Sequence, residues 1–162
     1  MSKVIVVFDS KTGFTERMAK AVVEGAKGVE GADIELIKVG TPFSISKLNS
    51  ADALIFGSPT RYGGVTQEMG FFLENVEAHK ESKRLNLSGK IGGVFASYEW
   101  DGGWVADKIK ANMESLGIQV VAPPVSLANG MRGRHGSNID AESLQKCRDL
   151  GKVVAEKATG TT

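Results

Sequence analysis

A short loop near the amino terminus carries the residue types that bind phosphate. It runs Asp9-Ser10-Lys11-Thr12-Gly13-Phe14-Thr15 and directly follows an apolar run. A segment of helical spacing begins at once. Free backbone N–H groups and the positive dipole end at a helix start favour a dianion, and Gly13 lets the backbone approach it closely. The loop therefore predicts a phosphate cradle at residues 10–15, with Lys11 as a cation at its rim.

A simpler interpretation is that Thr12 only caps the helix, as Ser and Thr commonly do. One hydroxyl group would be enough for that, whereas Ser10, Thr12 and Thr15 supply three. The loop also lacks the Gly-Lys-Ser/Thr ending of a nucleoside triphosphate loop and the three-glycine pattern of a dinucleotide site. A phosphate-bearing ligand of another kind is therefore expected.

Two further loops pair aromatic residues with adjacent glycines. The first consists of Pro59, Thr60, Arg61, Tyr62, Gly63 and Gly64, and the second of Ser97, Tyr98, Glu99, Trp100, Asp101, Gly102 and Gly103. A flat aromatic ligand needs apolar faces to stack on and bare backbone groups close to its polar edge. In either loop alone, the same residues could be exposed aromatics beside turn glycines. Both loops are expected at the same end of the sheet as the phosphate loop, which favours the ligand.

The elements that must position these loops are predicted from periodicity. Five apolar, β-branched runs cover residues 3–8, 33–39, 51–56, 90–96 and 118–127. Helical faces begin at Phe14, Met69, Ile109 and Leu144, and a weaker helix is expected within residues 40–50. Strands that are nearly continuous in apolar residues and alternate with helices predict a three-layer α/β fold with a parallel sheet. One domain, residues 1–158, and a flexible tail, residues 159–162, are expected.

Composition narrows the function classes. The 162 residues suit a single domain, and 20 basic against 19 acidic residues give a net charge of +1, so no nucleic-acid partner is expected. No apolar run approaches the ~18 residues of a membrane span. No signal-peptide pattern is present, and Cys147 is the single cysteine, so a cytoplasmic location is expected. Cys147 lies on an apolar helix face and is predicted to pack there.

The three loops resemble those of the flavodoxin-like superfamily, and the similarity extends over residues 3 to about 157. The resemblance implies a five-stranded parallel sheet of order 2-1-3-4-5 with helices on both faces. It also implies one non-covalently bound FMN as cofactor. Its phosphate would lie at residues 10–15 and its isoalloxazine ring between the other two loops, with Ser10 where that family usually has Thr.

Within the superfamily the resemblance is divided. The loop after the third strand, with Gln67, Met69 and Phe72 beyond it, is similar to the WrbA-like NAD(P)H:quinone oxidoreductases. The loop after the fourth strand and residues 146–152 are instead similar to the flavodoxin domain of flavodiiron proteins. The chain of 162 residues is too short to hold the metal-binding partner domain of those proteins as well. Its histidines are His79 and His135, so no metal site is expected.

The resemblance also implies roles for single residues. Thr60, Arg61 and Tyr62 would contact the flavin ring, and Trp100 would stack on it or flank it. Gly63 and Gly64 could present a backbone group to the N5 edge of the flavin. A separate loop holds Arg132, Arg134 and His135; it is either a solvated loop or a site that attracts an anionic partner or the phosphate of NADPH.

Three functions stay open at this stage. The first is FMN-dependent electron transfer to a redox partner protein. The second is an NAD(P)H-dependent quinone or small-acceptor reductase, which the near-neutral charge leaves room for. The third is a binding module without flavin, which the full set of hydroxyl groups in the first loop argues against. No catalytic side chain is predicted, since the flavin would do the chemistry, and the oligomeric state, including a homo-oligomer, is open.

Overall fold

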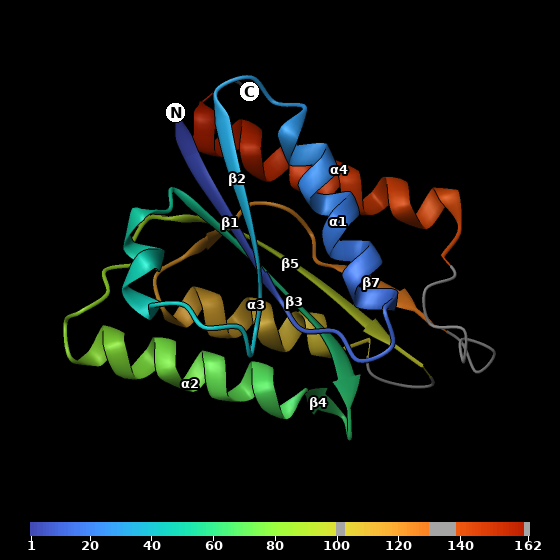
Figure 1. Ribbon diagram of the computed structural model, residues 1–162, viewed down its shortest axis with the longest axis horizontal. Helices are drawn as coiled ribbons and strands as arrows, with labels where there is room; N and C mark the ends of the chain where they lie inside the picture. Colours follow the sequence, from blue (N-terminus) through green and yellow to red (C-terminus); the bar gives the residue numbers. More distant parts are fainter. Residues whose placement is uncertain (100–102, 130–138, 161–162) are drawn as a thin grey trace.

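The computed structural model describes residues 1–99, 103–129 and 139–160 and places a sheet between two layers of helices (Figure 1). The helices are α1 (Phe14–Lys27), α2 (Gln67–Glu81), α3 (Val105–Ser115) and α4 (Ala141–Thr159), with a 3-10 helix at Ile45–Ser50. The strands are β1 (Ser2–Phe8), β2 (Ala32–Lys38), β3 (Ala53–Arg61), β4 (Gly64–Val65), β5 (Ile91–Tyr98), β6 (Gln119–Val120) and β7 (Val125–Ala128). The predicted three-layer α/β architecture is confirmed.

The sheet order agrees with the expected order, although the number of strands differs. The strands lie in the order β2-β1-β3-β5, and β6 and β7 share the fifth place because both pair in parallel with β5. The order 2-1-3-4-5 is therefore confirmed, but the sheet has seven strands rather than five. Pro123 and Pro124 separate β6 from β7, since proline has no N–H to donate to a strand ladder.

The seventh strand comes from a hairpin that the sequence placed in a loop. β3 continues to Arg61 and turns back into β4, so that Thr60 pairs with Val65 and Arg61 with Gly64 in antiparallel register. The two turn residues, Tyr62 and Gly63, have φ angles of 51° and 75°. Two successive left-handed residues suit the twist of a two-residue hairpin. Tyrosine is an unusual residue for the first of these positions, so the periodicity did not reveal the turn.

Each face of the sheet has its own hydrophobic core. α1 and α4 cover one face, where Met18, Val22, Leu150 and Val154 are buried against β1, β3 and β5 (Figure 1). α2 and α3 cover the other face, where Met69, Phe72, Ile109 and Met113 are buried. These are the apolar faces that the helical spacing predicted. Cys147 is fully buried in the first core, as predicted.

Two glycines let α1 and α4 cross closely. A Cβ atom on Gly25 would lie 1.9 Å from the backbone oxygen of Arg148, and one on Gly151 would lie 1.9 Å from the backbone oxygen of Val22. No other residue fits at these positions without moving a helix backbone. α4 continues to Thr159, so the first residue of the expected tail is helical. None of the described helices is long and apolar enough to span a membrane.

Candidate functional site

The loops after β1, β3 and β5 meet at one edge of the sheet because the three strands run parallel (Figure 1). Parallel strands of this kind bind ligands beyond their carboxyl ends, near the point where the chain order reverses. In this protein that point lies between β1 and β3, which are neighbours in the sheet. The predicted phosphate loop and both aromatic loops are therefore brought to the expected place.

The loop after β1 is organised by Ser10. Its Oγ accepts hydrogen bonds from the backbone N–H groups of Gly13 and Glu16, both at 3.2 Å. Gly13 occupies the N-cap of α1 in a left-handed conformation, with φ 95°, so the N-cap residue has no side chain to cap the helix and the Ser10 hydroxyl bonds the Glu16 N–H of the first turn. Thr12 is exposed. The interpretation of Thr12 as a helix cap is therefore wrong.

Several amides of this loop are left for a ligand. Among the described residues, no acceptor bonds the backbone N–H groups of Thr12, Phe14 or Thr15. They lie at the start of α1, where the helix dipole favours an anion. The Phe14 side chain is only 3% exposed and belongs to the core, so this residue can offer a ligand only its backbone.

Lys11, at the rim of this loop, is paired with two carboxylates. The Lys11 ammonium lies 2.8 Å from the Glu68 carboxylate and 3.5 Å from that of Asp9. The hydrogen bond to Glu68 raises the pKa of Lys11 above its ordinary value and lowers the pKa of Glu68. Lys11 is thus the cation predicted at the rim, but two carboxylates compete with any anion for it.

A narrow pocket joins the three loops. Its lining includes Thr12, Thr60, Arg61, Tyr98 and Asn129, together with Lys11, Pro59, Ser97 and Glu99. Two polar atoms here, Thr60 Oγ1 and Asn129 Oδ1, are buried and have no hydrogen-bond partner among the described residues. Buried polar atoms are normally paired, so a ligand with a polar edge fits this pocket better than an apolar one.

One contact ties the phosphate loop to the loop after β5. The hydroxyl groups of Thr15 and Ser97 lie 2.8 Å apart and are buried. Both residues were predicted to contact the cofactor. Their hydroxyl groups are hydrogen-bonded to each other, which joins the start of α1 to the end of β5.

Two described aromatic residues, Tyr62 and Trp104, lie at the β3–β4 turn. Tyr62 is fully exposed at the tip of the turn, and Trp104 is 43% exposed beside it. The Trp104 indole N–H donates a hydrogen bond of 3.1 Å to the Gly63 oxygen. The Gly103 oxygen accepts a hydrogen bond from Ser126. Trp100, Asp101 and Gly102, also predicted to bind the cofactor, lie outside the described residues.

Four residues of the site were missed in the sequence. Asn129 and Trp104 stand near the predicted loops, but their types alone did not distinguish them from surface residues. Asp9 and Thr66 are buried next to the site and hydrogen-bonded to each other at 2.5 Å. The signal for Asp9 was a carboxylate at the end of an otherwise apolar strand. Arg132, Arg134 and His135 lie outside the described residues.

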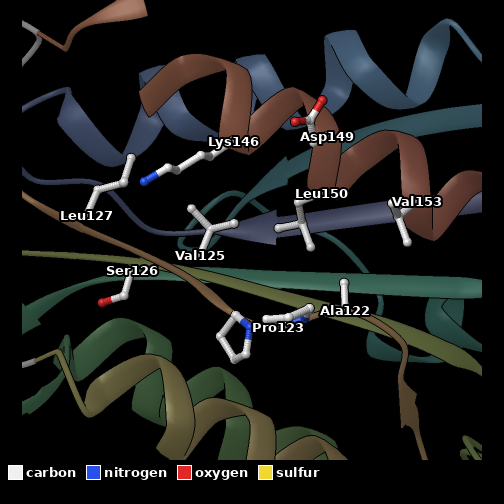
Figure 2. Close-up of a pocket in the computed structure, with 10 residues that line it drawn as sticks. Ala122, Pro123, Val125, Ser126, Leu127, Lys146, Asp149, Leu150 and Val153 are labelled. Atoms are coloured by element: carbon white, nitrogen blue, oxygen red, sulfur yellow. The ribbon is translucent and has the colours of Figure 1, made fainter. Parts of the chain in front are cut away.

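A hollow of about 380 Å³ lies between α4 and the β6–β7 segment (Figure 2). Its walls include Pro123, Val125, Leu150 and Val153, with Lys146 at the rim. It shares no lining residue with the pocket between the three loops.

In the described part of the chain, no three His, Cys, Asp or Glu side chains gather closely enough to hold a metal ion.

The fold and the three loops define an α/β protein in which backbone amides without an acceptor among the described residues lie beside a narrow pocket at the carboxyl ends of the strands. The family model described as flavodoxin matches residues 6–148, and the chain belongs to this family. It is 31% identical to a flavodoxin of Aquifex aeolicus over 96% of this chain and 86% of that protein. It is 33% identical to an NAD(P)H dehydrogenase (quinone) of Geotalea daltonii over 80% of this chain and 75% of that protein.

Solved structures agree with the family. A flavodoxin from the domain Archaea superposes with a TM-score of 0.79 at 28% identity and covers 97% of this chain and 99% of its own. Two more distant structures share the fold. A WrbA-like protein from Agrobacterium tumefaciens has a TM-score of 0.79 at 24% identity, and the match covers all of both chains. Rubredoxin oxygen:oxidoreductase from Desulfovibrio gigas has a TM-score of 0.80 at 23% identity, and the match covers 98% of this chain but 36% of that one. Structures named WrbA-like and flavodiiron, the two resemblances predicted from the loops, therefore both share this fold.

Proposed function

We propose that this protein binds one FMN non-covalently and exchanges electrons with a redox partner protein. The observation that carries the proposal is the cradle at the start of α1, where three amides have no acceptor among the described residues and the Thr12 hydroxyl is exposed. Membership of the flavodoxin family supports the same ligand. FMN would supply the electron chemistry, because its ring accepts and donates electrons.

The residues of the chain would bind and orient this cofactor. The amides of Thr12, Phe14 and Thr15 would hold the phosphate, and the dipole of α1 would favour its negative charge. Thr60 Oγ1 and Asn129 Oδ1, which are buried without partners, would pair with polar atoms of the ring. The exposed ring of Tyr62 would contact the flavin from the turn, and Tyr98, which lines the pocket at the end of β5, would contact it there. Of the other predicted contacts, Pro59 and Arg61 line the same pocket, Gly64 begins β4, and a Cβ on Gly103 would lie 3.9 Å from the Tyr98 ring.

A second candidate is an NAD(P)H-dependent quinone reductase. The specific observation in its favour is that three similar proteins, including those of Geotalea daltonii and Archaeoglobus fulgidus, are named NAD(P)H dehydrogenase (quinone). The near-neutral net charge of +1 also leaves the site accessible to a nicotinamide dinucleotide, whose phosphates are negatively charged. In this candidate, NAD(P)H and a small acceptor replace the protein partner. For either function we propose a cytoplasmic location, where a single unpaired cysteine stays reduced.

An anaerobic spectral titration of the flavin-loaded protein separates the two candidates. NADH or NADPH is added first, and dithionite afterwards. The electron carrier is expected to ignore both nicotinamides and to be bleached only by dithionite. Rapid bleaching by a nicotinamide would instead establish the reductase. A protein that fails to bind added FMN would overturn both.

A further inference from the structure

A buried polar network runs from the phosphate loop to the base of the β3–β4 hairpin. Asp9 is 2% exposed and follows β1 directly. Its Oδ1 accepts a hydrogen bond of 2.8 Å from the Ser10 N–H, and its Oδ2 accepts one of 2.5 Å from the Thr66 hydroxyl. Burying a carboxylate is costly unless it is hydrogen-bonded, and both oxygens of Asp9 are bonded here.

Thr66 connects Asp9 to the hairpin through two hydrogen bonds. It is 1% exposed and caps α2, where its Oγ1 accepts the N–H of Met69 at 3.2 Å. Its own N–H donates to Ser58 Oγ at 3.3 Å, and the Ser58 hydroxyl donates to the Pro59 oxygen at 2.8 Å. Ser58 and Thr66 stand on the two sides of residues 59–65. Their hydrogen bond therefore closes the base of the loop that carries the β3–β4 turn.

The turn held in this way is under strain. Tyr62 has a φ angle of 51°, which side chains other than glycine adopt only at a cost. Its side chain is fully exposed, so side-chain packing does not hold this conformation. The constraint comes from the strand pairing of β3 with β4, from the Trp104 hydrogen bond to Gly63, and from the closed base at Ser58 and Thr66.

The negative charge of Asp9 does not favour phosphate binding, so we assign its role to the hydrogen bonds that it accepts. A carboxylate next to an anion cradle repels a phosphate group, and it also draws on Lys11, whose Nζ lies 3.5 Å from Asp9 Oδ2. If charge alone mattered, an uncharged side chain at this position would improve phosphate binding. The hydrogen bonds of Asp9 join two parts of the site. In Asp9→Asn an NH2 donor replaces one of the two accepting oxygens, so one charge-assisted hydrogen bond, to the Ser10 N–H or to the Thr66 hydroxyl, is lost.

We propose that Asp9 is a positioning residue that acts through Thr66 to couple the order of the phosphate loop to that of the β3–β4 hairpin. The proposal rests on the proposed FMN site, since it assigns these two loops to the two ends of one ligand. Loosening Asp9 then loosens both loops. Ordering one loop lowers the entropic cost of ordering the other.

The test compares Asp9→Asn with wild type for two ligands, FMN and riboflavin, by quenching of flavin fluorescence. Riboflavin lacks the phosphate, so it reports on the hairpin side. The proposal expects both affinities to fall by about tenfold, the loss that accompanies one charge-assisted hydrogen bond. Tighter FMN binding with unchanged riboflavin binding would overturn it, because that is the result of removing a repulsive charge alone.

Variants of Thr66 and Asp140 separate positioning from stability. Thr66→Val should weaken riboflavin binding as Asp9→Asn does, and Thr66→Ser should restore it because the hydroxyl donor is kept. Asp140 caps α4 by accepting the Ser143 N–H at 2.7 Å and takes no part in the network. Asp140→Ala should therefore lower the unfolding temperature and leave both affinities unchanged. If it weakens riboflavin binding as much as Thr66→Val does, general loss of stability explains the effect and the proposal fails.

Amide hydrogen exchange of the ligand-free protein tests the coupling without any flavin. In Asp9→Asn, exchange should accelerate both in residues 10–15 and in residues 59–65. Acceleration confined to residues 10–15 would overturn the coupling. This measurement stands even if wild type binds no flavin, an outcome that would remove the proposed function alone.

Discussion

At the scale of single residues, Thr12 gives the most direct test of the phosphate cradle. It is exposed, and no described residue bonds its hydroxyl group, because Ser10 accepts the first-turn amides. We expect Thr12→Val to weaken FMN binding by about ten- to a hundredfold, the value of one hydrogen bond to a charged group. The free energy of unfolding should change by no more than about 0.5 kcal/mol, as for an ordinary surface substitution.

Riboflavin is the control ligand for this variant, since it has no phosphate for Thr12 to bind. Its affinity should stay at the wild-type value. If Thr12→Val costs about 1 kcal/mol of stability and leaves FMN affinity unchanged, Thr12 acts as a helix cap after all. Fluorescence titration and urea unfolding of the same preparation give both quantities.

Cys147 is expected to be unreactive in the native protein. Its side chain is fully buried, and burial raises the pKa of its thiol to about 12. Thiolate is the reactive form, so at pH 8 an alkylating reagent should modify the protein only after unfolding. Mass spectrometry after labelling with and without urea checks this. Rapid labelling of the native protein would mean that α4 opens from the sheet far more often than its packing indicates.

At the scale of elements, the crossing of α1 and α4 depends on two glycines. Helix propensity alone predicts that Gly25→Ala or Gly151→Ala stabilises its helix by about 1 kcal/mol. The added Cβ would lie 1.9 Å from a backbone oxygen of the other helix. We therefore expect each variant to lose about 2–3 kcal/mol of unfolding free energy, as overpacked cores do.

Gly70→Ala is the matched control, because Gly70 is also inside a helix, α2. Its added Cβ would lie 3.8 Å from Val65 Cγ2, an ordinary contact distance. This variant should be neutral or gain up to about 1 kcal/mol. Equal effects at Gly25 and Gly70 in urea unfolding would show that the two helices can move apart at little cost.

The elements differ in how far the sequence predicts them. Apolar patterning predicts the four long helices and β1, β2 and β5, because burial places apolar residues at every third or fourth position of a helix and along most of a buried parallel strand. It misses the β3–β4 hairpin, since Tyr62 at a left-handed turn position breaks the usual residue preference. It also joins β6 to β7, because valines flank Pro123 and Pro124 and hide the interruption.

The candidate site divides in the same way. Its loops were predictable because hydroxyl, glycine and aromatic residues gather where strands end. The hydrogen bonds between loops could not be predicted. Thr15 and Ser97 are 82 positions apart, and Asp9 and Thr66 are 57 positions apart. Only the folded chain brings these pairs together. Sequence therefore predicts which loops form the site, and the structure assigns what each side chain does there.

At the scale of the whole molecule, ligand binding should raise the unfolding free energy and the Tm of the protein. A ligand that binds only the folded protein stabilises it by about 2.7 kcal/mol at a hundredfold excess over its Kd. For a domain of this size, each kcal/mol raises Tm by roughly 2–4 °C, so removal of FMN should lower Tm by roughly 5–10 °C. Differential scanning calorimetry of the apo and FMN-loaded protein measures this difference.

The same scan can separate the two halves of the proposed site. FMN engages both the cradle at α1 and the pocket between the loops, whereas riboflavin engages only the pocket. At equal ligand concentration, FMN should therefore raise Tm more than riboflavin, and the difference should shrink in Thr12→Val, where the cradle has lost one donor. Equal shifts for the two ligands in wild type would mean that the phosphate contributes nothing. The unpartnered amides of Thr12, Phe14 and Thr15 would then need another ligand.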